Sequence, residues 1–111
     1  MNKLNFLRTA SSLGKMLCLG FLTLMIRSVT LAASVNVNIE PSAFDPDNVT
    51  INVNDQVVWT WVSDSHSTTS NDGLWDSGVF DTGHVFTNTF TSAGSFPYFC
   101  IVHGFTGNVN V

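Results

Sequence analysis

The 111-residue chain divides into two parts of opposite charge. All four Lys and Arg residues fall within the first 27 positions, whereas all eight Asp and Glu residues lie from Glu40 onward. The acidic part excludes nucleic-acid binding through a basic patch, because phosphate contacts need cationic donors. It also disfavours docking to an anionic membrane surface. The 78 residues from Ser34 onward are enough for one domain only.

Residues 1–33 have the pattern of a secretory signal peptide. Three basic residues precede an apolar run at 17–26, which is too short to cross a bilayer but has the length of a signal-peptide core. Cleavage after Ala32 places Thr30 and Ala32 at the two recognition positions, and cleavage after Ala33 is the alternative. We therefore expect an exported protein, periplasmic or extracellular, with no membrane insertion after cleavage. An uncleaved N-terminal anchor is the competing interpretation.

The exported segment has the alternation of half-buried β-strands. Apolar Val35, Val37 and Ile39 alternate with polar residues, and 48–53 shows the same period of two. No helical periodicity follows residue 33. The segments with strand character are 34–40, 48–53, 56–62, 84–91, 95–100 and 107–111.

The connections between these strands complete the predicted fold. Residues 40–47 contain two Pro residues and form a connection in which Phe44 is expected to plug the core. A long polar stretch at 63–83 contains turn signals, and Trp75 within it is expected to be a second plug. Six or seven short strands in one small domain predict an all-β, Greek-key β-sandwich or small barrel.

Cys100 is the one cysteine that remains after the predicted cleavage. Small secreted domains usually depend on disulfides, yet a single cysteine cannot form one within its own chain. In an oxidising compartment a lone thiol must be buried, paired between chains or bound to something else.

Two histidines offer that thiol partners in metal binding. His103 follows Cys100 by three residues at the end of a predicted strand, and His66 lies in the polar loop after the strand 56–62. Loops at one end of an antiparallel sandwich can bring all three residues together. Two imidazoles and a thiolate in a trigonal arrangement suit copper in electron transfer. Zinc is the alternative, but it needs a fourth ligand or a water.

At this point residues 39–111 resemble the plastocyanin-type cupredoxins, the blue copper proteins. The matching segments, in chain order, are 44–46 with 49–51, 55–59, 64–67, 75–78, Phe86 and Phe90, 93–103, and 107–109. The resemblance implies a cupredoxin-like sandwich and one copper ion cycling between Cu(I) and Cu(II). It also implies that the protein is an electron carrier and not an enzyme, with His66, Cys100 and His103 as the three equatorial ligands.

The sequence departs from the family at the axial position. Most of the family has a Met after the second His, but this chain has no Met after residue 25. Phe105, Thr106 and Asn108 are the candidates for the vacant position, depending on how the loop is aligned. We expect a three-ligand site whose axial side is covered by Phe105.

Ser67 and His84 are two further polar residues with alternative interpretations. Ser67, directly after His66, is a candidate for a hydrogen bond to the loop that carries Cys100, with a solvated hydroxyl as the alternative. His84 lies beside a Gly turn and is interpreted as an exposed residue without a function.

The sequence thus predicts a monomeric blue copper protein that carries single electrons between redox partners. Eight carboxylates without a compensating Lys or Arg create a field that attracts a basic docking face on the partner. A copper-binding module for delivery, storage or sensing is one alternative. A metal-free interaction domain on the same fold is another, and a thiol enzyme that uses Cys100 and His103 ranks last.

Overall fold

The computed structural model describes residues 23–111. Most of the predicted signal peptide lies outside this range, so its prediction stays untested. Residues 23–33 form neither a helix nor a strand. Within the described part of the chain, no helix has the length and apolar character needed to cross a membrane.

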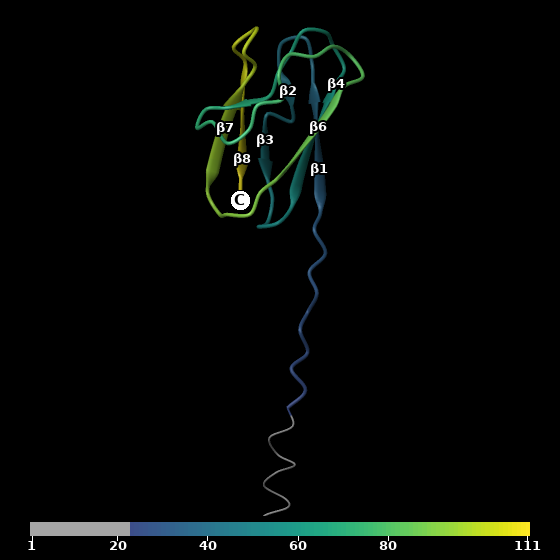
Figure 1. Ribbon diagram of the computed structural model, residues 1–111, viewed down its shortest axis with the longest axis vertical. Helices are drawn as coiled ribbons and strands as arrows, with labels where there is room; N and C mark the ends of the chain where they lie inside the picture. Colours follow the sequence, from purple (N-terminus) through teal and green to yellow (C-terminus); the bar gives the residue numbers. More distant parts are fainter. Residues whose placement is uncertain (1–22) are drawn as a thin grey trace, which may run out of the picture. The chain divides into compact units, whose positions relative to one another are not determined.

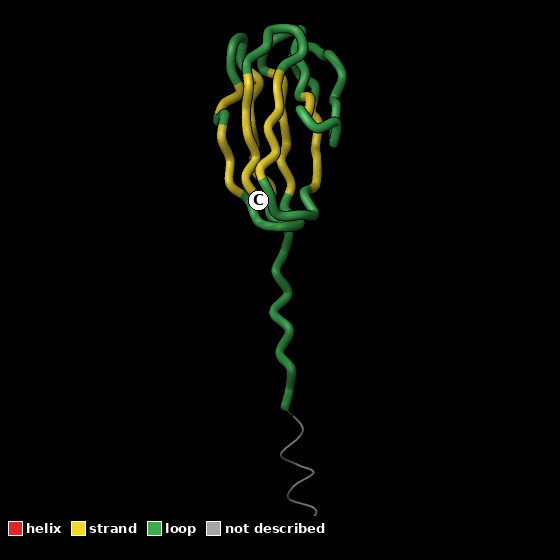
Figure 2. The backbone as a smooth tube through the Cα atoms, turned by 90° about the vertical axis from the view of Figure 1, so that its left-hand side faces the viewer, coloured by secondary structure: helices red, strands yellow, loops and turns green. Residues whose placement is uncertain are grey.

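The chain from Ser34 onward forms two four-stranded sheets (Figure 1). The first sheet contains, in spatial order, β2 (Phe44–Asp45), β1 (Ser34–Ile39), β4 (Gln56–Trp61) and β6 (Val85–Thr89). The second contains β3 (Asn48–Thr50), β8 (Thr106–Asn110), β7 (Ser95–Phe99) and β5 (Thr69–Ser70). Figure 2 shows the strands running between two sets of loops, one at each end. This all-β architecture confirms the predicted β-sandwich.

Two parallel pairings join distant parts of the chain. β1 pairs with β4 in parallel, with Ser34 opposite Gln56 and Ile39 opposite Trp61. β3 pairs with β8 in parallel, and the remaining pairings are antiparallel. Because β1 and β4 run in the same direction, both strands begin at one end of this sheet and finish at the other.

The core follows the predicted alternation. Val37 and Ile39 of β1 are fully buried, and in β4 the buried side chains are Val57, Trp59 and Trp61. The predicted plugs Phe44 and Trp75 are also buried. The complete core cluster is Val37, Ile39, Phe44, Val49, Ile51, Val57, Trp59, Trp61, Trp75, Phe90, Tyr98, Cys100 and Val109.

The structure differs from the prediction in three places. Two strands of two residues each, β2 and β5, lie in the segments expected to be connections. They are too short for an alternating pattern, and pairing with β1 and β7 defines them. Val53 leaves the core and is 45% exposed, because the chain turns at Asn54, which has a φ of 75°.

Gly107 and Tyr98 pack too closely for any side chain at position 107. They are opposite each other in the β7–β8 pair, and a Cβ on Gly107 would lie 2.8 Å from Cε1 of the buried Tyr98 ring. Close backbone approach, and not a special φ, therefore requires glycine here.

We expect Gly107→Ala to lower the free energy of unfolding by about 1–3 kcal/mol, the range for overpacking a well-packed core. Urea unfolding measures the change. Thr106→Ala, an exposed position in the same strand, serves as the control and should change stability little. An unchanged urea midpoint for Gly107→Ala would show that the Tyr98 ring can move aside.

Candidate metal centre

His66, Cys100 and His103 come together at one end of the sandwich, from two different loops. His66 follows β4, Cys100 comes directly after β7, and His103 lies in the turn between β7 and β8 (Figure 1). The Cys100 Sγ atom is 3.6 Å from His66 Nδ1 and 4.0 Å from His103 Nδ1. The two Nδ1 atoms are 3.1 Å apart.

These distances fit one metal ion bound by all three atoms. Metal bonds measure about 2.0–2.1 Å to imidazole nitrogen and about 2.3 Å to thiolate sulfur. Each of the three observed separations is shorter than two such bonds placed end to end, so one ion can reach every donor. In the described residues this is the one group of three or more His, Cys, Asp or Glu side chains with metal-binding geometry.

The three residues differ in their exposure to solvent. Cys100 is fully buried and His66 is 2% exposed, whereas His103 is exposed. Burial lowers the pKa of His66, and the neighbouring His103 lowers it further. A lowered pKa favours the neutral imidazole, which is the form that binds a metal.

Hydrogen bonds join and brace the two loops. The Ile101 N–H donates to Ser67 Oγ at 3.0 Å and so connects the residue after Cys100 to the residue after His66. Within the second loop, the Cys100 N–H donates to the Phe105 carbonyl at 2.9 Å and the Gly104 N–H donates to the Cys100 carbonyl at 2.8 Å. The hydrogen bond predicted for Ser67 is therefore confirmed.

Hydrogen bonds to both backbone polar groups of His66, the N–H and the carbonyl, hold it in place. Its N–H and carbonyl pair with the carbonyl and N–H of Phe80, at 3.1 Å and 3.0 Å. The Trp61 indole N–H donates to the same His66 carbonyl at 2.7 Å. The strand character of 56–62 predicts a β-strand there, but it does not show the direction of the Trp61 indole N–H.

His84 also belongs to this surrounding structure. Its ring stacks on Phe80 with centroids 3.6 Å apart and meets the edge of Trp61 at 4.9 Å. The side chain is half-buried, so its interpretation as an exposed residue was wrong. The packing against Phe80 supports the strand-like segment that pairs with His66.

The three candidates for the axial position lie in different surroundings. The Phe105 ring is 5.3 Å from the His66 ring and 4.7 Å from the Phe44 ring, between the cluster and the core. Thr106 is an exposed residue of β8. The Asn108 side chain hydrogen-bonds to Ser95 and Asn110, so its amide is committed elsewhere. No Met occurs between Leu31 and Val111 to supply a thioether.

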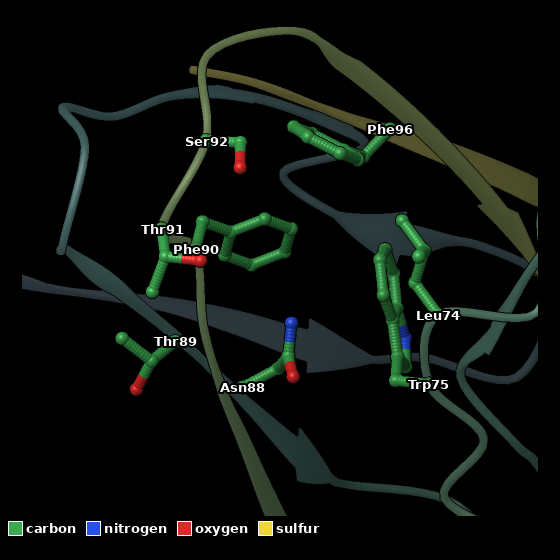
Figure 3. Close-up of a pocket in the computed structure, with 8 residues that line it drawn as sticks. All are labelled: Leu74, Trp75, Asn88, Thr89, Phe90, Thr91, Ser92 and Phe96. Carbon is green, nitrogen blue, oxygen red and sulfur yellow. The ribbon is translucent and has the colours of Figure 1, made fainter.

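A separate pocket of about 260 Å³ lies toward the other end of β7 (Figure 3). The residues that line it are Leu74, Trp75, Asn88, Thr89, Phe90, Thr91, Ser92 and Phe96. None of these residues is a titratable group or one of the usual metal ligands. The pocket therefore does not compete with the cluster at Cys100 as a candidate metal site.

Comparisons with known proteins were made for both sequence and structure. No family model and no curated protein matches the sequence. Among solved structures, the reduced Cu(I) form of an amicyanin mutant is 23% identical, with a TM-score of 0.65, and the match covers 76% of this chain and 86% of that one.

Two further structures have the same architecture. A purple cupredoxin from Nitrosopumilus maritimus is 26% identical over 68% of this chain and 97% of its own, with a TM-score of 0.60. A Sinorhizobium pseudoazurin is 20% identical over 71% of this chain and 73% of its own, with a TM-score of 0.58. The chain therefore has the cupredoxin fold, and its His–Cys–His cluster fits a blue copper protein.

Proposed function

We propose that this protein is an exported blue copper protein that carries single electrons between redox partners, with His66, Cys100 and His103 as the copper ligands. The observation that carries the proposal is the cluster of two imidazole nitrogens and one buried thiol, each within 4.8 Å of the others. Copper bound there supplies the one-electron Cu(I)/Cu(II) couple. The residues around the cluster support the remaining parts of the proposal, which are the choice of metal, the transfer of electrons and the kind of partner.

The donor set favours copper over zinc. A closed zinc site needs four ligands, and a catalytic one needs a water in an open position. Here the described residues supply three donors, and Phe105 places an aromatic ring beside them instead of a fourth donor. Three donors of imidazole and thiolate type suit a trigonal copper site.

The hydrogen bonds around the cluster support electron transfer specifically. Ser67 joins the two ligand-bearing loops, and Phe80 and Trp61 fix the backbone of His66. A centre braced in this way changes little in geometry when its charge changes, and a small change in geometry favours rapid electron exchange. A site for delivery must instead release its ion.

The exposed His103 is the route by which we expect electrons to enter and leave. Cys100 and His66 are buried, so His103 is the member of the cluster that a partner can approach directly. Ile101 and Val102 beside it are 58% and 47% exposed. A partner that covers these apolar side chains reaches His103 without desolvating a charge.

The charge of the domain bears on the choice of partner. Glu40 is the first of eight carboxylates, and no Lys or Arg follows Arg27. We expect a monomer that meets a redox partner with a basic docking face, such as a basic c-type cytochrome. The field would raise the rate of encounter and leave the cluster itself unchanged.

Copper delivery, storage or sensing is the second candidate. It is favoured by one observation, the absence of a Met after residue 25 to serve as an axial thioether donor. Reversible electrochemistry with fast electron exchange would support the carrier, whereas slow exchange with easy loss of copper would support this second function.

Cys100→Ser tests the ligand assignment. Adding one equivalent of Cu(II) to the exported domain should produce an intense thiolate-to-copper absorption band and a narrow EPR hyperfine splitting. Both signals should disappear completely in Cys100→Ser, because a hydroxyl cannot replace the thiolate. His84→Gln is the matched control and should keep the colour, since His84 packs outside the cluster. Colour that persists in Cys100→Ser would remove Cys100 from the ligand set.

Phe105→Met tests the axial side. A thioether at this position would donate to Cu(II), so the reduction potential should fall and the rhombicity of the EPR spectrum should change. Phe105→Leu removes the ring without adding a donor and is the control. Equal potentials for the Met and Leu variants, measured by voltammetry, would mean that residue 105 does not face the copper.

Ionic strength tests the charge of the docking partner. The rate of electron transfer to a basic cytochrome should fall as salt rises from about 0.01 to 0.15 M, because the Debye length shortens from about 30 to 8 Å. Stopped-flow kinetics measures the rate, with an uncharged redox reagent as the control. A rate with the cytochrome that is independent of salt would contradict electrostatic steering.

A further inference from the structure

The backbone amide of Ala33 lies directly against the carboxylate of Asp55. The Ala33 N–H donates to Asp55 Oδ1 at 2.9 Å, and the Asn52 N–H donates to Oδ2 at 2.9 Å. The Asp55 side chain is 7% exposed. The Ala33 carbonyl in turn accepts from the Gln56 N–H at 2.8 Å. Both backbone polar groups of Ala33 are thus used to fix the start of the sandwich.

Ala33 also directly precedes the first strand of the sandwich. β1 starts at the next residue, Ser34, which pairs with Gln56. Before it, residues 23–32 form no helix or strand. The large apolar side chains there, Leu24, Met25, Ile26, Val29 and Leu31, are 83–86% exposed. Such a row of exposed apolar side chains is a liability in a finished exported protein.

We infer that export processing cuts the Ala32–Ala33 peptide bond, and that the α-ammonium group released at Ala33 forms an ion pair with Asp55. The inference rests on the export part of the proposed function and is independent of the copper centre. In the cut, water adds across the peptide bond: its hydroxyl goes to the Ala32 carbonyl carbon and its proton to the Ala33 nitrogen. The new amine then takes up a second proton from solvent at neutral pH.

The contacts of Ala33 distinguish this bond from its neighbours. A cut after Ala33 would remove both the donor to Asp55 and the acceptor for Gln56, and would leave the carboxylate of Asp55 without its partner at Oδ1. A cut before Ala32 would leave a neutral amide at Ala33. Only the cut between Ala32 and Ala33 puts a positive charge at the atom that already contacts the carboxylate.

The charge is significant because the domain has so few cations. From residue 33 onward there is no Lys or Arg, so the new ammonium group would be its one amino group. The pKa of Asp55 is already lowered by the N–H groups of Ala33 and Asn52, against a smaller opposing effect of burial. No titratable side chain in residues 23–111 contributes to that shift. An adjacent carboxylate should raise the pKa of the amine above its usual value of about 7.7–8.0.

The first experiment identifies the processed chain. The full chain is expressed in a bacterial host that secretes it, and the exported product is examined by intact mass and N-terminal sequencing. We expect the mature chain to begin at Ala33. A chain that begins at Ser34, or one that keeps its N-terminal segment, would overturn the inference.

The second experiment isolates the charge. Residues 33–111 contain all eight described strands and the whole core, so they fold as a unit. Two metal-free forms are compared, one with a free amine and one with an N-acetyl group that keeps the N–H donor without the charge. Both are also made with Asp55→Asn. Urea unfolding at several pH values and the NMR titration of the α-amine give the readouts.

At pH 7 we expect the free-amine form to have a folding constant about two- to fivefold larger than the acetylated form, as for a solvent-accessible ion pair. The amine pKa is raised in the folded state, so this advantage is present below the unfolded pKa and is lost as the pH rises through the folded value. It should be absent with Asp55→Asn.

Equal stability of the two forms at every pH would overturn the ion pair. If Asp55→Asn fails to fold, the amine pKa in the folded wild-type chain decides, and an ordinary value counts against the pair. Because the protein is metal-free throughout, failure of the copper assignment would leave these outcomes unchanged.

Discussion

The candidate metal centre is held together by direct contacts between two loops, of which a hydrogen bond beside the cluster is the nearest. The cluster draws His66 from the loop after β4 and the other two residues from the turn after β7, in different sheets. The Ile101 N–H to Ser67 Oγ contact links these loops directly, next to Cys100 on one side and His66 on the other. The pairing of Thr69 with Phe99, between β5 and β7, is a second link close to the same residues. The small Ser67 side chain is fully buried, so water does not compete for this hydroxyl.

The aromatic interior explains why the two sheets hold their spacing. Trp59 of β4 meets Tyr98 of β7 edge-on, with ring centroids 5.3 Å apart, and Trp75 packs against both. The Trp59 indole N–H and the Tyr98 hydroxyl are buried and make no hydrogen bond of ordinary geometry. Burial raises the pKa of Tyr98 to about 12, with the nearby Trp59 N–H opposing it. Tyr98 is thus a neutral spacer two residues before Cys100, and Gly107 leaves the room that its ring needs.

Two kinds of feature could be predicted from the sequence: strands with a characteristic residue pattern, and residue types that commonly bind metals. The alternation in 34–40 located β1, and the strand character of 56–62 located β4. The lone Cys100 with His103 three residues later, together with the resemblance to cupredoxins that added His66, indicated the cluster, since few residue types bind metals. These signals are local, and each is readable without knowing what lies opposite.

The features that sequence analysis missed are defined by their partners. β5 is two residues long and exists through its pairing with β7, and no pattern of two residues can show that. Phe80 is exposed and lies in a polar stretch, yet its backbone holds His66. His84 stacks on Phe80 only because the turn at 81–83 folds back. Such contacts depend on long-range packing, which composition and spacing do not encode.

β4 runs from the end of the sandwich that carries Asp55 to the end that carries the His–Cys–His cluster. Asp55 comes directly before it, and His66 follows at its other end after a short loop. Because β1 runs parallel to β4, Ala33 lies at the Asp55 end, and the metal cluster lies at the opposite end. On the two proposals above, the ammonium of Ala33 would meet the Asp55 carboxylate at one end, and copper would meet a thiol and two imidazoles at the other. Because the length of β4 separates these two sites, we expect loading of the metal and trimming of the chain to proceed in either order.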